Sequence, residues 1–118
     1  MKVQQIFLRV YGTEIDKMVS FYENLLGEPC TLRAVNKALC VELAQVSNVL
    51  IICGAEDVLA AFRETKATFM VDSVTEYRAF LSANGAEIVK DAKETPAGIN
   101  MFVRHPDGML AEYLEPRT

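Results

Sequence analysis

The chain has 118 residues, 51% hydrophobic and 24% charged, and carries a formal net charge of −4 at pH 7. This length and apolar content predict one compact soluble domain and exclude a disordered or collagen-like chain. The 12 basic residues are scattered, and no apolar run approaches the roughly 18 residues that a membrane span requires. We therefore expect no nucleic-acid partner, no membrane partner and a cytoplasmic location.

The first half of the chain predicts a strand, a helix and three further strands. Residues 5–10 (QIFLRV) alternate, with Ile6, Leu8 and Val10 on one face of a strand. Thr13 and Asp16 match a capping box that starts a helix over residues 15–26, which Gly27 ends. The strands expected next cover residues 30–34, 38–43 and 49–53.

The second half repeats this order. Residues 66–71 predict a strand, and Ser73 with Glu76 forms a second capping box before a helix that ends at Asn84-Gly85. The strands expected to follow cover residues 87–90, 99–104 and 110–114. The stretch 91–94 (DAKE) is predicted to be a solvated loop, and the single histidine, His105, is expected to be solvated in a turn.

Several short motifs follow one another along the chain, and they come from both halves. They include FYENLLG (21–27), ANGAEI (83–88) and PDGMLAEY (106–113). With them the chain resembles the vicinal oxygen chelate superfamily, which contains glyoxalase I, bleomycin-resistance proteins, fosfomycin-resistance enzymes and extradiol dioxygenases. The resemblance covers nearly the whole chain.

The resemblance implies an α+β fold in which two βαβββ modules form a cupped mixed β-sheet with helices packed outside. A single domain over residues 1–118 then consists of module one (1–54), a linker (55–64) and module two (65–118). We expect the helices to cover the face of Ile6, Leu8 and Val10. By strand parity, the opposite face lines the cup with Gln5, Phe7 and Arg9 in the first module and Lys66, Thr68 and Met70 in the second.

In metal-dependent members of this superfamily, each module supplies a ligand from its first strand and a carboxylate from its last. By that resemblance the four positions fall on Gln5, Glu42, Lys66 and Glu112. A protonated lysine cannot ligate a metal, and one histidine cannot build a site of two histidines and one carboxylate. No metal or other cofactor is therefore expected; a divalent metal ion, if bound, would use Gln5, Glu42 and Glu112. A register shift of one residue would replace Lys66 by Thr65 or Ala67, neither of which is a good ligand.

The leading functional prediction is a glyoxalase/bleomycin-resistance-like protein that binds a small organic molecule in a sheet-lined cavity without a metal. The expected ligand-binding residues are Gln5, Phe7, Arg9, Glu42, Lys66, Thr68, Met70, Phe102 and Glu112. One alternative is a metal-dependent lyase or isomerase that resembles glyoxalase I, with a degenerate metal site. A metal-free enzyme would use Lys66 and Glu112 as catalytic groups, and a role without any ligand is the remaining class. The resemblance also implies a homodimer.

Overall fold

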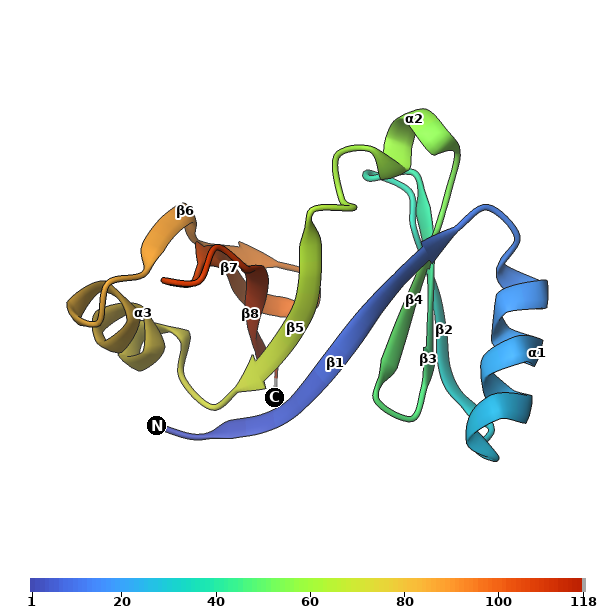
Figure 1. Cartoon of the computed structure of the whole chain (residues 1–118), viewed down its shortest axis with the longest axis horizontal. Helices are drawn as coiled ribbons and strands as arrows, with labels where there is room; N and C mark the ends of the chain where they lie inside the picture. Colours follow the sequence, from blue (N-terminus) through green and yellow to red (C-terminus); the bar gives the residue numbers. More distant parts are fainter. Residues whose placement is uncertain (118) are drawn as a thin grey trace. The chain divides into compact units, whose positions relative to one another are not determined.

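The computed structural model describes residues 1–117 (Figure 1). Eight strands are hydrogen-bonded in the order β2-β3-β4-β1-β5-β8-β7-β6. This α+β fold of βαβββ-like modules confirms the predicted fold class. The elements in chain order are β1 (Val3–Gly12), α1 (Ile15–Leu26), β2 (Cys30–Asn36), β3 (Val41–Val46), β4 (Val49–Cys53), α2 (Glu56–Leu59), β5 (Thr65–Val71), α3 (Val74–Ala83), β6 (Glu87–Thr95), β7 (Gly98–Arg104) and β8 (Leu110–Pro116).

Two compact units divide the chain at Leu8 and at Thr65. The N-terminal unit is residues 8–64, and the C-terminal unit is residues 1–7 together with residues 65–118. The predicted module two, 65–118, thus shares its unit with the first residues of β1. Among the described residues, no helix is long and apolar enough to cross a membrane.

In the N-terminal unit, α1 packs against the face of β3 and β4 that carries a buried apolar cluster. The end of β1 runs parallel to β4, while β3 pairs antiparallel with both β2 and β4. Gly27 ends α1 in a left-handed conformation, with φ 67°, and its N–H donates to the Glu23 carbonyl. The cluster under α1 consists of Ile15, Val19, Ala44, Val46, Val49, Ile51 and Cys53.

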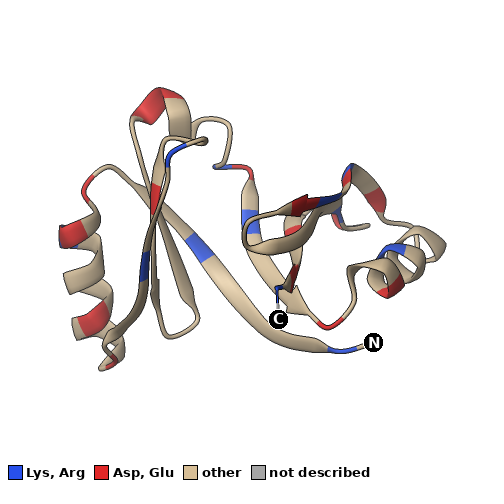
Figure 2. Ribbon diagram, turned by 180° about the vertical axis from the view of Figure 1, so that it is seen from behind, with Lys and Arg blue, Asp and Glu red and all other residues tan. Residues whose placement is uncertain are grey.

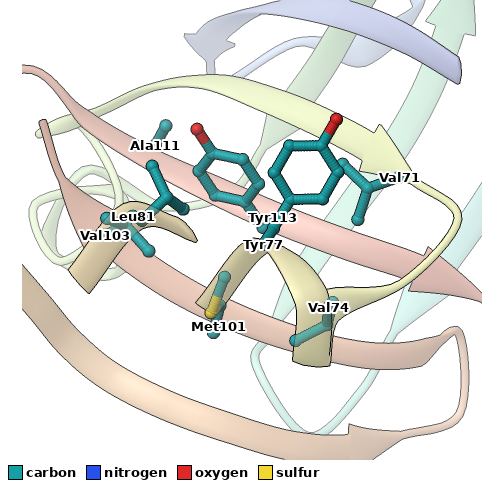
Figure 3. Packing of buried hydrophobic residues seen from close by; sticks show 8 residues of the cluster. All are labelled: Val71, Val74, Tyr77, Leu81, Met101, Val103, Ala111 and Tyr113. Atoms are coloured by element: carbon teal, nitrogen blue, oxygen red, sulfur yellow. The ribbon is translucent and has the colours of Figure 1, made fainter. Parts of the chain in front are cut away.

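In the C-terminal unit, β5 runs parallel to β8, and β7 pairs antiparallel with β8 and β6. Side chains of α3 point toward those of the sheet and form a buried apolar cluster with them (Figure 3). Ser73 caps α3 by accepting a hydrogen bond from the Glu76 N–H at 3.2 Å, which confirms the second capping box. The cluster beneath the helix consists of Val71, Val74, Tyr77, Leu81, Met101, Val103, Ala111 and Tyr113.

Three local predictions are wrong. Glu14, not Thr13, is the N-cap of α1, and its side chain makes no capping hydrogen bond. Residues 91–94 belong to β6, because their backbone pairs with β7 despite their charge. His105 is half-buried, with Nε2 at 2.8 Å from the Tyr113 hydroxyl oxygen and its ring edge against Phe69, so it is not a solvated turn residue.

The predicted helix-covered face of β1 is only partly covered. Val10 packs against the cluster under α1, as expected. Ile6 and Leu8 are 49% and 57% exposed, so for these two residues the prediction is wrong. The reason is that α1 packs on β3 and β4, and α3 packs on β6, β7 and β8.

Candidate functional site

One sheet face of the C-terminal unit is turned away from α3. Cross-strand partners in a sheet point to the same side, so the register assigns each side chain to a face. Tyr113 and Met101 pack under α3, which places their neighbours Glu112 and Phe102 on the opposite side. We call this side the open face; on β5, β7 and β8 it comprises Thr65, Thr68, Met70, Asn100, Phe102, Arg104, Leu110, Glu112 and Leu114.

Glu112 is the central acidic group of the open face. Its Oε1 accepts a hydrogen bond from the Thr68 hydroxyl at 3.0 Å, and its Oε2 accepts one from the Asn100 amide at 3.1 Å. Thr68 is 3% exposed, and Asn100, Phe102 and Glu112 are half-buried. Two donors from neighbouring strands therefore fix the orientation of the carboxylate.

The structure brings three of the predicted ligand-binding residues, Thr68, Phe102 and Glu112, into one row. Thr68 is the β5 partner of Glu112, and Phe102 is its β7 partner. Met70 lies in the next row, opposite Leu114. Asn100 was missed by the sequence reasoning, although its spacing of two from Phe102 was the signal that placed it on the same face.

Lys66 is not the cross-strand partner of Glu112. Thr65 pairs with Leu110 and Ala67 with Ala111, so Lys66 is the extra residue of a β-bulge, and its side chain is exposed. The pairing with Leu110 places buried Thr65, rather than Lys66, on the open face. The assignment of Lys66 to the cup was therefore wrong in register, and the shift to Thr65 is one of the two considered from the sequence.

Glu42 lies on the side of the N-terminal unit that α1 covers. It is exposed and pairs with Cys53, whose Sγ is 3.5 Å from Sδ of Met18 on α1. Burial, followed by the negative charge of Glu42, raises the pKa of the Cys53 thiol. The last strand of this half is β4, which contains no carboxylate. The placement of Glu42 on a last strand that lines a cup is therefore wrong.

The remaining predicted residues lie on β1. Phe7 is 3% exposed, and Gln5 and Arg9 are half-buried. An Arg9 guanidinium N–H donates to the Tyr11 hydroxyl at 3.0 Å, and the guanidinium also lies 6.0 Å from the centre of the Tyr11 ring. Arg9 thus forms a local pair within β1.

The donor set does not fit the metal site that the superfamily implies. The first-strand neighbour of Glu112 is Thr68, and its equivalent in the repeat, when Val10 is matched to Val71, is Phe7. A phenyl ring supplies no ligand atom, and the Thr68 hydroxyl already donates to the carboxylate. Among residues 1–117, no group of three His, Cys, Asp or Glu side chains is arranged to hold an ion.

Shallow hollows lie elsewhere on the surface. One of about 380 Å³ lies at the end of α3, and one of about 310 Å³ lies beside the turn between β2 and β3. Glu112 lines neither of them. Charged residues are dispersed over the helices and strands of both units (Figure 2).

Comparisons with known proteins agree with this architecture. A hypothetical protein from Methanosarcina mazei is 42% identical and superposes with a TM-score of 0.87, over 99% of this chain and 95% of that chain. Methylmalonyl-CoA epimerase from Mycobacterium tuberculosis is 15% identical, with a TM-score of 0.76 over 98% of this chain and 90% of that one. The Streptomyces coelicolor epimerase with 2-nitronate-propionyl-CoA is 18% identical, with a TM-score of 0.74 over 99% and 100%. No family model and no curated protein matches the chain.

The eight-stranded sheet of βαβββ-like modules is the fold of the vicinal oxygen chelate superfamily, and the chain shares this fold with the methylmalonyl-CoA epimerases. The chain belongs to the same family as the Methanosarcina mazei protein.

Proposed function

We propose that this protein binds a small organic molecule on the open face of its C-terminal unit, without a metal ion. The observation that carries the proposal is the Glu112 carboxylate, held by Thr68 and Asn100 at 3.0 and 3.1 Å on the open face. Binding sites typically combine apolar walls with a few fixed polar groups. This face supplies both kinds of group.

The chemistry of the face favours a ligand with a hydrogen-bond donor and an apolar or planar body. Glu112 is an acceptor, so it pairs with a ligand N–H or O–H group. Phe102 is its cross-strand neighbour and offers a ring for stacking. Met70 and Leu114, in the adjacent row, extend the apolar surface.

A metal-dependent lyase or isomerase is the second candidate, and the fold shared with methylmalonyl-CoA epimerases favours it. One of those solved structures holds 2-nitronate-propionyl-CoA, so an acyl thioester belongs among the ligands to be tried. The positions of the residues that we expected to bind a metal ion argue against this candidate function. Glu42 lies on the α1 side of its unit, and Thr68 occupies the position beside Glu112.

The metal-free proposal is tested by screening a fragment library against ¹⁵N-labelled protein. We expect ligands that shift amide resonances of β5, β7 and β8, and we expect Glu112→Gln to abolish those shifts. Glu94→Gln is the matched control, because Glu94 pairs with Ile99, which packs on the α3 side of the sheet. Hits that bind equally well to the Glu112→Gln variant contradict the proposal.

The same preparation decides between the two candidates. Elemental analysis after dialysis against mixed divalent ions is expected to find no stoichiometric metal. About one tightly held ion per chain, lost in Glu112→Gln, would support the second candidate, and turnover of a thiohemiacetal or an acyl thioester would then be measured. The proposal also includes a homodimer, for which the exposed Ile6 and Leu8 of β1 provide apolar contact surface.

A further inference from the structure

We infer that the ligand of the open face carries an anionic group, a carboxylate or a phosphate, which is held by Lys90 and Lys93 of β6. This inference rests on the proposed binding function and specifies the class of ligand. The argument begins from the register of β6, because a strand that carries both acidic and basic residues can sort them between its two faces.

The pairing of β6 with β7 places both lysines on the open face. Lys90 pairs with Phe102 and Lys93 pairs with Asn100, and both partners are open-face residues. A single row therefore runs across four strands, in the order Lys90, Phe102, Glu112 and Thr68. The Lys90 ammonium lies 5.6 Å from the centre of the Phe102 ring, which confirms that it reaches over this row.

The acidic residue between the two lysines is directed elsewhere. Asp91 accepts two hydrogen bonds from the Arg78 guanidinium of α3, at 2.7 and 2.8 Å. Its charge is thus compensated on the helix side of the sheet. Within residues 1–117, Lys90 and Lys93 form no ion pair. The other acidic residue of β6 on this face, Glu87, lies opposite Arg104, so the two lysines leave the β6 side of the row with positive charge.

The spacing of the row sets the length of the ligand. Adjacent strands lie about 4.8 Å apart, so the backbones of Lys90 and Glu112 are separated by about 10 Å across β7. The Lys90 side chain extends over the ring of Phe102, the residue that lies between the two. A molecule with an anion at one end and a hydrogen-bond donor at the other spans this distance over Phe102. A neutral molecule of the same shape leaves the ammonium groups unused.

The test uses two probes of nearly identical shape, 4-hydroxybenzoate and its neutral amide, 4-hydroxybenzamide. Dissociation constants are measured by ¹⁵N chemical-shift titration at millimolar probe concentrations. We expect the benzoate to bind at least five-fold more tightly, and we expect this preference to shrink as the salt concentration rises. In Lys90→Gln and Lys93→Gln, the benzoate should weaken three- to five-fold each, while the benzamide stays unchanged. Lys37→Gln, in the turn after β2, is the control and should have no effect.

Failure of this inference can be distinguished from failure of the proposed function. Equal affinities for the two probes, no binding of the benzoate, or no effect of the two lysine variants overturns the anionic class. In each of these cases, fragment hits that depend on Glu112 leave the proposed function standing. If Glu112→Gln alters the binding of no ligand at all, the proposed function itself falls. A benzoate that binds more tightly at resonances of the N-terminal unit also overturns the lysine assignment.

Discussion

Thr68 and Glu112 lie opposite one another on the parallel strands β5 and β8, and the threonine hydroxyl donates to the carboxylate at 3.0 Å. Thr68 is nearly buried, so this contact is protected from competing water. The pair joins the two strands at the centre of the open face. It fixes the one acidic group on which the proposed function depends.

Removing the hydroxyl is expected to destabilise the C-terminal unit. Thr68→Val keeps the shape of the side chain but leaves Oε1 of Glu112 without this donor. Hydrogen bonds to charged groups contribute about 2 kcal/mol, so we expect a loss of that size in the free energy of unfolding, measured with urea. Thr68→Ser keeps the hydroxyl and should lose clearly less. Equal losses in the two variants would show that packing, not the hydrogen bond, matters here.

The contact between Arg78 and Asp91 predicts a dependence of stability on acid. The hydrogen bonds from Arg78 lower the pKa of the Asp91 carboxyl to about 2, from an ordinary value of 3.8. Because the folded-state pKa is lowered, the contact stabilises the protein above about pH 4, and this contribution is lost as the pH falls toward 2. The difference in urea midpoint between wild type and Arg78→Gln should therefore shrink over that range. Asp91→Asn should behave in the same way, and a difference that is independent of pH would contradict the prediction.

The buried phenol of Tyr113 predicts a dependence of stability on alkaline pH. Burial raises the pKa of its phenol to about 12, from 10. Between these values the unfolded chain releases a proton that the folded chain keeps. The free energy of unfolding is therefore unaffected by this group below about pH 10, and it falls as the pH rises from 10 through 12. Urea unfolding between pH 9 and pH 12 should show a shallower decline in Tyr113→Phe than in wild type, and parallel declines would count against this assignment.

Gly98 is expected to tolerate no side chain. It has φ 142°, and an added Cβ would overlap the carbonyl oxygen of Glu115 on β8. Gly98→Ala should cost about 3 kcal/mol of unfolding free energy, at the upper end of the range for a strained backbone position. Gly27, with φ 67° and open space around its Cα, provides the comparison. Gly27→Ala should cost about 1 kcal/mol, the penalty of the left-handed conformation alone. A smaller loss at Gly98 than at Gly27 would refute the steric argument.

The proposed homodimer is tested on β1. Ile6 and Leu8 are exposed apolar side chains on the same side of the strand. Ile6→Lys and Leu8→Lys should convert the dimer into a monomer in sedimentation velocity experiments, since a buried unpaired charge is costly. Val89→Lys, at an exposed apolar residue of β6, is the control. A dimer that survives both β1 variants places the interface elsewhere, and a monomeric wild type removes the dimer from the proposal.

Much of the fold follows from the internal repeat, because the repeat depends on features that act locally. Alternating residues form β1 and β5, and the Ser73 cap and Gly27 bound their helices through contacts within one turn. The side that a strand residue faces is less predictable. The alternation of side chains between the two faces holds only where the strand pairs without a bulge. The bulge in β5 breaks that alternation, and it explains why Thr65 rather than Lys66 lies on the open face, opposite Leu110.

The error at Glu42 has a different origin. The sequence of its strand, β3, resembles that of the last strand of the second half. Cys40, Val41 and Leu43 surround an acidic residue much as the neighbours of Glu112 do. Within this half of the chain, the strand that pairs with β1 is β4, which is entirely apolar apart from its final cysteine. Which strand is the last of its half depends on hydrogen bonds between segments that are distant in sequence. A local pattern in a single sequence does not predict those pairings.

The extra residue in β5, Lys66, marks a position where the chain can lose one residue without a change in strand pairing. Thr65 and Ala67 already pair with two consecutive residues of β8, Leu110 and Ala111. Removing Lys66 would join two residues that already face opposite sides, and the ladder would close without moving Thr68 away from Glu112. A deletion almost anywhere else in this strand would turn every following side chain over. Relatives one residue shorter at this point can therefore keep the same open face.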